Sequence, residues 1–414
     1  MDFDDTPGEA AFRAEAREWL DAHAIPKGHP DDFSHSYLDV DLDEDRHVEL
    51  CRWWQRTLSD GGWAGLTWPI AYGGRGATAI QSVIFNQEQS GYGVSPGSFA
   101  VAVSMVGPTI LAHGTDAQQH RFLPPILRGE EIWCQLFSEP GAGSDLAGLA
   151  TRAERDGDEW VVNGQKVWTS QADHSQWGIL VTRTDPDAAK HRGITYFLLD
   201  MATPGIDVRP LRQMTGSAHF SEVFLDDVRI PHANVLGEVD GGWGVAVATL
   251  SAERAMIGGG SRGDDVAELI AMAGKLGLAG EAHVRQELAS AYTRQQLLRY
   301  LGLRAQTALS QGRAPGPETS VMKLAYAEHL RCVGDLVLAI EGPAGTLAGP
   351  DAPERGQWQG RFLHAPAIRI AGGSNEIQRN IIGERVLGLP GEARVDRDVP
   401  FRRLALASAP KAGG

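Results

Sequence analysis

The stretch EWVVNGQKVWTS, residues 159–170, marks the place where the chain changes from a helical to a strand pattern. Apolar and polar residues alternate on both sides of Asn163-Gly164, and Asn-Gly is a strong signal for a two-residue hairpin turn. We therefore expect two short strands that meet in a hairpin at Asn163-Gly164. The segments QWGILVTRTD, GITYFLLDM and HFSEVFLDDVRI follow with similar patterns, so the middle of the chain is predicted to be all-β.

Helical periodicity flanks this β segment on both sides. Before it, amphipathic runs such as AFRAEAREWL and TDAQQHRFLPPILRGEE extend from residue 8 to about residue 130. After Pro231, helical patterns return and continue to EIQRNIIGERVLGL. This order predicts an α+β multidomain fold rather than a parallel doubly wound one. The expected units are an N-terminal all-α domain at 1–130, a middle β domain at 131–237, a C-terminal helical bundle at 238–390 and a C-terminal tail, an extended arm, at 391–414.

The composition restricts the possible partners and compartments. The chain has 414 residues, of which 53 are acidic and 38 are Lys or Arg, which gives a formal charge of -15. That charge would repel nucleic acid and anionic lipids. The N-terminus has no signal-peptide pattern, and an 18-residue apolar run is absent from the sequence. We expect a cytoplasmic protein with no nucleic-acid partner and no membrane insertion.

Cysteine and histidine spacing gives no sign of a metal site. Cys51, Cys134 and Cys332 lie far apart without a CxxC pair, and the histidines form no HExxH motif. We expect buried thiols and no metal. Since no GxGxxG follows a strand and opens a helix, a dinucleotide would have to bind without a Rossmann site.

A Glu-Arg pair, Glu253-Arg254, interrupts the apolar helical run GVAVATLSAERAMI. With 3.6 residues per turn, Glu253 shares a face with Ala246, Leu250 and Ile257, so burial among hydrocarbon should raise the pKa of its carboxyl. Such a carboxyl suits a general base that removes a proton from carbon. The alternative is a structural ion pair with an arginine of a neighbouring helix.

The segment WCQLFSEPGAGSDLAG, residues 133–148, joins an apolar run to a loop of small residues whose backbone N–H groups could approach a ligand. On its own it could also be an ordinary turn. Together with HGTDAQQHRFLPPILRGEEIW, DEWVVNGQKVWTS, FSEVFLDDVRIP and GGSNEIQRNIIGERVLGLP, it resembles the acyl-CoA dehydrogenase family from about residue 60 to residue 390. The resemblance implies an N-terminal helical domain, a middle β-barrel-like domain and a C-terminal four-helix bundle. It also implies a tetramer with FAD at a subunit interface.

The resemblance carries over functional residues. Those implied to bind FAD are Gln135, Phe137, Ser138, Ser144, Trp168, Thr169, Ser170, Arg285, Ser374 and Glu376. Those implied to contact the substrate are Ser144, Leu250, Arg254 and Gly372. The chain departs from the family pattern at Leu288 and Ala289, which replace Phe and Gly of the motif around Arg285, and at Ala339, where a glutamine that contacts adenine is expected.

The family pattern also bears on the identity of the base. In many members the base is a glutamate of the bundle loop, but Gly372 stands at that place. Members similar to isovaleryl- and long-chain acyl-CoA dehydrogenases carry it on the earlier helix, where this chain has Glu253. The resemblance therefore implies Glu253 as the base. The Gly372 N–H would donate to the thioester carbonyl beside a ribityl hydroxyl of the flavin.

The predicted function is FAD-dependent dehydrogenation of an acyl-CoA to the trans-2-enoyl-CoA, as in fatty-acid β-oxidation. A proton would go to Glu253, a hydride to flavin N5, and electrons onward to an electron-transfer flavoprotein. The assembly would be a homotetramer or a heterotetramer. One alternative is a non-catalytic or half-site partner subunit of a heteromeric dehydrogenase, which the departures at Leu288, Ala289 and Ala339 suggest. A flavin oxidase or monooxygenase on the same fold is another. The acyl class, and whether CoA or a carrier protein bears it, stay open.

Overall fold

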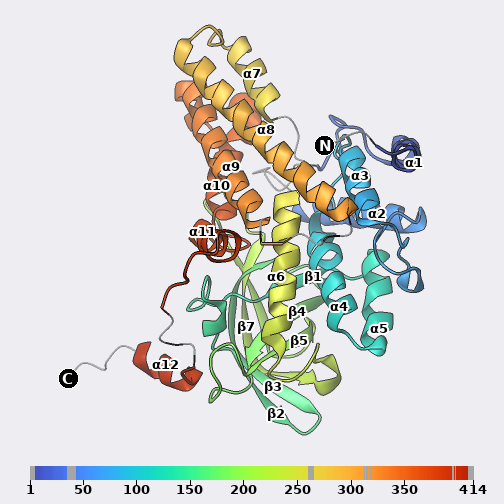
Figure 1. The fold of residues 1–414 in the computed structure, drawn as a ribbon, viewed down its shortest axis with the longest axis vertical. Helices are drawn as coiled ribbons and strands as arrows, with labels where there is room; N and C mark the ends of the chain where they lie inside the picture. Colours follow the sequence, from blue (N-terminus) through green and yellow to red (C-terminus); the bar gives the residue numbers. More distant parts are fainter. Residues whose placement is uncertain are drawn as a thin grey trace, which may run out of the picture.

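The computed structural model describes residues 5–34, 43–259, 265–311, 313, 316–317, 319–393, 396 and 398–408. Helices occupy both ends of this part of the chain and strands occupy its middle, so the predicted α–β–α order is confirmed. Figure 1 shows the sheet with N-terminal helices beside it, and a group of C-terminal helices that extends away from it.

The N-terminal helices pack around an aromatic-rich core. Capping boxes start three of the helices, each with a Thr at the N-cap and a Glu or Gln three residues later. Trp54, Phe99 and Leu123 are fully buried among them. A π-helical segment, Ala102–Val106, precedes α4, and such segments often mark functional sites. The α-helices are α1 (Pro7–His23), α2 (Glu44–Asp60), α3 (Ala79–Gln89), α4 (Gly107–His113) and α5 (Asp116–Leu127).

The middle domain is one curved, mixed sheet. Its order is β1-β4-β2-β3-β7-β6, and β5 pairs with the other side of β4. β1 and β2 run parallel to β4, and the remaining pairs are antiparallel. β4 and β5 are buried almost throughout, because other elements cover both of their faces. The strands are β1 (Trp133–Leu136), β2 (Arg152–Asp156), β3 (Glu159–Ser170), β4 (Trp177–Arg183), β5 (Ile194–Asp200), β6 (Ile206–Leu211) and β7 (Phe220–Pro231).

The predicted hairpin at Asn163-Gly164 is wrong. β3 runs through both residues, and the chain turns earlier, at residues 157–158 between β2 and β3. Asn163 is used in a long-range contact: its Nδ2 donates to Asp227 Oδ1, and its Oδ1 accepts the Asp227 N–H, both at 2.9 Å, next to a β-bulge. Gly164 is needed for space, because a Cβ there would lie 2.4 Å from Thr151 Oγ1.

The close approach at Gly164 gives a stability prediction. We expect Gly164→Ala to destabilise the fold by about 2 kcal/mol, because the new methyl group would overlap Thr151. Gly302→Ala in α8 is the matched control, since nothing lies within 4 Å of a Cβ at that position and Ala favours a helix over Gly by about 1 kcal/mol. The midpoint of thermal unfolding should fall for the first variant and hold or rise for the second. An unchanged midpoint for Gly164→Ala would contradict the close contact.

The C-terminal helices gather around α9, which contacts α6, α8, α10 and α11. Leu269, Val337 and Trp358 lie in the core of this bundle. α6 lies next to β5 and the N-terminal helices and connects the bundle to the rest of the molecule (Figure 1). The helices are α6 (Gly242–Gly259), α7 (Asp265–Lys275), α8 (Ala282–Ser310), α9 (Thr319–Glu341), α10 (Gln357–Ile368) and α11 (Asn375–Ile381).

The described part of the C-terminal tail packs back on the middle domain. Its helix α12 (Phe401–Ser408) begins against the loop between β4 and β5, where the Phe401 N–H donates to Ala188 O at 2.9 Å. The Arg183 guanidinium lies 4.1 Å from the centre of the Phe401 ring. Arg402 also pairs with Asp187 at 2.9 Å.

Two further observations concern the expectations drawn from composition. Within the described ranges, no helix combines the length and the apolar character that crossing a bilayer requires. Cys51 and Cys134 are buried free thiols, as expected, whereas Cys332 is a free thiol that is only partly buried.

Candidate active site

Glu253 lies on α6 opposite the end of β1. Gln135 Nε2 donates to its Oε2 at 3.4 Å, and the backbone N–H of Gly372 also acts on the carboxyl as a donor. Although part of the side chain is accessible to water, protein surrounds the carboxyl closely. Burial therefore raises its pKa above the ordinary value, against the opposing effects of Gln135, Arg254, Gly372 and Lys323.

The face of α6 that carries Glu253 is only partly hydrocarbon. Ala246 and Thr249 are buried, and Leu250 packs on the apolar core. The Thr249 hydroxyl lies 3.1 Å from the hydroxyl of Tyr196 and 3.0 Å from that of Thr109, which joins all three domains. The side chain of Ile257 lies outside the described residues. The rise in the pKa of Glu253 thus occurs on a helix face that carries polar as well as apolar residues.

Arg254 is directed away from the carboxyl. Its Nη2 donates to Ser251 Oγ at 2.9 Å, as expected for adjacent helical residues that point about 100° apart. Burial lowers the pKa of the guanidinium, the charge of Glu253 opposes this shift, and Arg385 adds to it. Arg254 therefore carries a charge beside Glu253 without a direct contact to it.

A glycine pair forms the loop opposite Glu253. Gly372 and Gly373 both have left-handed φ values, 66° and 92°, which glycine adopts without strain. Gln378 Nε2 donates to the carbonyls of Gly372 and Gly373, at 2.9 and 3.1 Å. These carbonyls thus face α11, whereas the Gly372 N–H faces the carboxyl of Glu253. Ser374 caps α11, and its Oγ accepts the Ile377 N–H at 3.4 Å.

A buried ion pair anchors the glycine-rich loop that follows β1. Lys166 Nζ on β3 donates to Glu139 Oε1 at 2.8 Å and to Phe137 O at 3.1 Å. The Glu139 carboxyl also accepts the N–H groups of Ala150 and Thr151, at 2.7 and 3.0 Å. Burial alone would raise the pKa of Glu139, but Lys166 and these donors outweigh it and hold the pKa below the ordinary value. The carboxylate stays ionised and ties both ends of the loop to β3.

A bulge at the end of β3 turns Trp168 outward. The pairing of β3 with β7 shifts between Lys166 and Thr169, and Trp168 has a positive φ of 62°, an unusual conformation for a bulky residue. Its ring is 59% exposed and meets Phe220 edge-on at 6.2 Å. The side chain of Thr169 is buried, and its hydroxyl has no hydrogen-bond partner among the described residues. Bulges that re-aim side chains are common next to active sites.

A cavity of about 470 Å³ lies against the side of α6 that carries Ala252 and Met256. It is enclosed by α2, α3, the π-helical segment before α4, and α6. Ala252 and Met256, which flank Glu253 along α6, form one wall. Much of the opposite wall is aromatic: Trp54, Trp63, Trp68 and Phe85.

Comparison with known proteins identifies the family of the chain. Residues 6–130, 134–228 and 240–387 match the N-terminal, middle and C-terminal domains of acyl-CoA dehydrogenases, respectively. The acyl-CoA dehydrogenase IpdE1 of Mycobacterium tuberculosis (strain ATCC 25618 / H37Rv) is 41% identical over 397 residues, which cover 92% of this chain and 98% of that protein. The chain belongs to the acyl-CoA dehydrogenase family.

Solved structures of family members agree with this membership. The Tcur3481-Tcur3483 steroid ACAD, an acyl-CoA dehydrogenase, is 30% identical with a TM-score of 0.81 and covers 95% of this chain and 100% of its own. The ChsE4-ChsE5 complex from Mycobacterium tuberculosis is also 30% identical, with a TM-score of 0.77 and the same coverage. The predicted three-part fold and the acyl-CoA dehydrogenase activity are therefore confirmed. The family binds FAD.

The structure of the enzyme brings together some of the residues implied by the resemblance. Gln135 contacts Glu253 directly, and the Gly372 N–H is close enough to affect the Glu253 carboxyl. Arg254 and Leu250 lie on the same helix as Glu253, and Ser374 follows the glycine pair. Ser138 and Ser170 are half-buried at the start of the glycine-rich loop and the end of β3, Ser144 is exposed in the loop, and Glu376 is exposed on α11 and pairs with Arg379 at 3.2 Å.

Two implied residues stand apart. The Phe137 ring is buried in the core, edge-on to Tyr196 at 5.8 Å, so only its backbone is turned toward the loop. Arg285 is exposed in the first turn of α8, at the end of the bundle that lies away from the sheet (Figure 1). Leu288, one turn later, is buried in the bundle core. Arg285 can therefore reach a ligand at Glu253 only in another chain.

The sequence analysis missed Lys323 on α9. Its side chain is fully buried, and its Nζ donates to Gly373 O at 2.7 Å. Burial lowers the pKa of this ammonium to about 8, against the charges of Glu253 and Glu376. A charged residue within the apolar helical run SVMKLAYA is the same kind of signal that pointed to Glu253, and it could have revealed Lys323.

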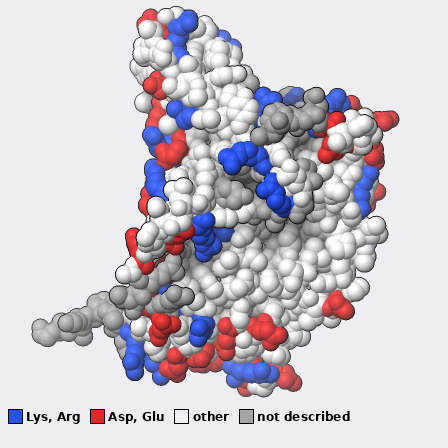
Figure 2. Space-filling view, viewed as in Figure 1, with Lys and Arg blue, Asp and Glu red and all other residues white. Residues whose placement is uncertain are grey.

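Charge on the face shown in Figure 2 is distributed unevenly. Acidic and basic side chains lie mainly along the rim, the broad middle is mostly uncharged, and Lys and Arg side chains gather around the central hollow. A local excess of positive charge would attract phosphate groups despite the net charge of -15.

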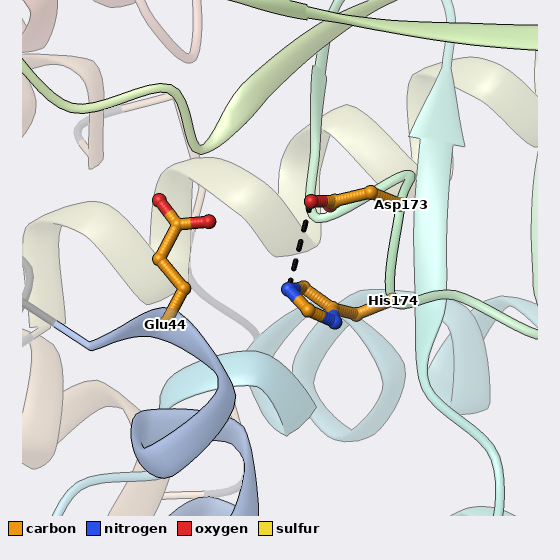
Figure 3. A group of neighbouring side chains, drawn as sticks. All are labelled: Glu44, Asp173 and His174. Carbon is orange, nitrogen blue, oxygen red and sulfur yellow. Dashed lines mark ion pairs between the residues drawn. The ribbon is translucent and has the colours of Figure 1, made fainter.

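One further cluster joins the N-terminal and middle domains. Glu44, at the start of α2, lies beside Asp173 and His174 in the loop after β3 (Figure 3). His174 Nε2 is 3.5 Å from Asp173 Oδ2. Burial and the neighbouring Asp173 raise the pKa of Glu44, while His174 opposes this shift. We assign this cluster a role in the contact between the two domains, because nothing else in the described residues points to a bound cation there.

Proposed function

We propose that the enzyme dehydrogenates the CoA thioester of a bulky, steroid-derived acyl group, with Glu253 as the base. The proposal depends mainly on one observation: the helix that carries a carboxyl of raised pKa, with the Gly372 N–H as a donor, also forms a wall of a cavity of about 470 Å³ whose other wall is largely aromatic. A carboxyl of this kind accepts a proton from carbon more readily than an ordinary glutamate does.

The residues around Glu253 have complementary roles in proton abstraction. As the α-carbon loses its proton to the Glu253 carboxylate, negative charge moves to the thioester oxygen. The Gly372 N–H, one of the two donors beside the base, would stabilise that oxygen. Gln135 restrains the carboxylate through its 3.4 Å contact. The apolar walls of the cavity would exclude water and hold the acyl group.

The residues at the end of β3 fit a flavin. Thr169 has a buried hydroxyl without a partner among the described residues, and Trp168 presents an exposed ring held by a strained backbone. Ser138 and Ser170 lie on the two anchored segments next to them. In this proposal these four residues hold the isoalloxazine end of FAD, which when bound supplies the hydride acceptor. Ser144, Ser374 and Glu376 belong to the rest of the cofactor site.

The relatives support the substrate class. A solved relative that covers this chain almost completely is described as a steroid acyl-CoA dehydrogenase. The large aromatic side chains around the cavity suit a fused-ring acyl group. We therefore propose a steroid-derived acyl group, one of the acyl classes that the sequence left open, in place of the substrates of fatty-acid β-oxidation. An electron-transfer flavoprotein stays the proposed electron acceptor.

A second, different family chain completes the cofactor site in this proposal. The exposed Arg285 lies far along α8 from the sheet, and the solved relatives named above each combine two differently named chains. The chain expressed alone should therefore retain little FAD, and flavin content should rise when it is produced with its partner. Full flavin occupancy and activity in a homotetramer would contradict the heteromeric assembly.

Anaerobic flavin reduction tests the function. A panel of short-chain, long-chain and steroid-derived acyl-CoA thioesters is added to the flavin-loaded enzyme, and the loss of visible flavin absorbance is followed. We expect the fastest bleaching with a steroid-derived thioester. Absence of bleaching with every thioester would contradict the dehydrogenase function. Peroxide release under oxygen at the rate of substrate oxidation would favour the oxidase alternative.

A further inference from the structure

Lys323 is a fully buried cation between the bundle and the site. It lies in the second turn of α9, and its side chain is among the largest that are fully buried in the described part of the chain. A buried ammonium is unfavourable unless it is hydrogen-bonded and close to negative charge. The groups around Lys323 therefore have to supply a hydrogen bond and negative charge.

The hydrogen bond of Lys323 fixes one side of the glycine pair. Its Nζ donates to Gly373 O at 2.7 Å, and Gln378 Nε2 donates to the same oxygen at 3.1 Å. A Cβ on Gly373 would lie 2.7 Å from Gln378 Nε2, so the loop packs tightly against these donors. With its carbonyls held toward α9 and α11, the loop keeps the Gly372 N–H toward Glu253.

The charge of Lys323 acts on the same carboxyl. The ionised groups that affect Lys323 are Glu253 on α6 and Glu376 on α11. Those that affect Glu253 are Arg254 on its own helix and Lys323 on α9. The Arg254 side chain is also influenced by Arg385. Lys323 is thus the cation from a facing helix that favours the ionised form of Glu253, and Arg254 is the cation from the same helix.

We propose that Lys323 is a positioning residue for proton abstraction: it holds the Gly373 carbonyl and thereby orients the Gly372 N–H, and its positive charge favours the ionised form of Glu253. This inference rests on the proposed role of Glu253 as the base. Without Lys323 the loop would lose a buried donor, and Glu253 would keep its proton up to a higher pH. The first effect lowers the rate at every pH, and the second lowers it mainly at neutral and acidic pH.

Three variants separate the effect of the hydrogen bond to Gly373 from the effect of the Lys323 charge on Glu253. Lys323→Gln keeps a donor for Gly373 and removes the charge, Lys323→Met removes both, and Lys323→Arg keeps both. Lys275→Met, at an exposed lysine at the end of α7, is the matched control. The protonation of Glu253 is read without turnover, from the carboxyl band in infrared difference spectra between each protein and its Glu253→Gln counterpart over a pH series. Anaerobic flavin reduction by the best thioester of the panel is then measured over the same pH range.

We expect the Glu253 titration midpoint to move to higher pH in Lys323→Gln and Lys323→Met, and to stay in place in Lys323→Arg and Lys275→Met. Flavin reduction by Lys323→Gln should fall about tenfold at pH 7 and recover at high pH, whereas Lys323→Met should stay slow throughout. Unchanged midpoints in both uncharged variants would overturn the proposal, and if Lys323→Met fails to fold, Lys323→Gln decides. If none of the thioesters reduces the flavin of the wild type, the proposed function fails. The infrared titration midpoints of Glu253 still test the role of Lys323 in that case.

Discussion

Glu253→Gln is expected to lower the rate constant of flavin reduction by an acyl-CoA thioester about a thousandfold. Glutamine has nearly the same shape, so the cavity and the contact with Gln135 can persist, but its amide cannot accept the α-proton. The measurement is anaerobic stopped-flow absorbance of the flavin at saturating thioester. Binding of the thioester should change far less than the rate, because the substituted atom matters in the transition state and little in the bound ground state.

The pH dependence gives an independent view of the same carboxyl. Only the ionised form of Glu253 can take a proton, and burial raises the pKa of this group above the ordinary value. The wild-type rate should therefore fall as the pH drops through that raised pKa, so its acid limb lies at higher pH than an ordinary glutamate would give. Glu253→Gln should lose this limb together with most of the rate.

The matched control for this substitution is Glu287→Gln, at an exposed position on α8. It removes the same charge at a distance from the site and should reduce the flavin at the wild-type rate. If Glu253→Gln bleached as fast as the wild type, another group would have to be the base, and the assignment of Glu253 would be abandoned.

Local patterns predicted most of the strands and singled out Glu253 as the candidate base, because each signal depends on residues that lie close together in the sequence. Buried and more exposed residues alternate along much of β7, as a half-buried strand requires, whereas β4 and β5 are buried almost throughout. Glu253 was visible because a charge in an apolar helical run has few explanations. The helical blocks were found for the same reason, from their period of 3.6 residues.

The hairpin prediction failed where a distant partner outweighed a local preference. Asn163-Gly164 has a favourable turn composition, but Asn163 bonds Asp227 on β7 and Gly164 makes room for Thr151. The actual turn uses Gly157, whose φ of 63° suits a tight turn. Gly157-Asp158 and Asn163-Gly164 lie only a few residues apart, and the pairing of β3 with β7 decides which of them forms the turn.

The supporting contacts of the site could not be predicted from spacing. Lys166 pairs with Glu139 across 27 positions, and Lys323 meets Gly373 across 50. Neither pair has a period that a helix or a strand would produce. The outward position of Trp168 likewise depends on a shift of register between β3 and β7, which reverses the faces that simple alternation assigns.

The cavity with the aromatic wall gives the second large effect, a change in substrate preference. Ala252→Phe adds a ring to the wall that α6 contributes, at the position before Glu253 in the sequence. A bulky acyl group that fills this cavity would then lose room. We expect kcat/KM for a steroid-derived thioester to fall about a hundredfold, which corresponds to about 3 kcal/mol of lost transition-state binding.

The same substitution should affect small substrates little. A short-chain thioester occupies only the part of the cavity nearest Glu253, so its kcat/KM should stay within about threefold of the wild type. Val247→Phe on the exposed side of α6 is the matched control, because it adds bulk to the same helix outside the cavity. Equal losses for the bulky and the short thioester would indicate damage to the base itself. No loss for either would mean that the acyl group binds elsewhere and that the aromatic wall of the cavity serves only to pack the N-terminal domain.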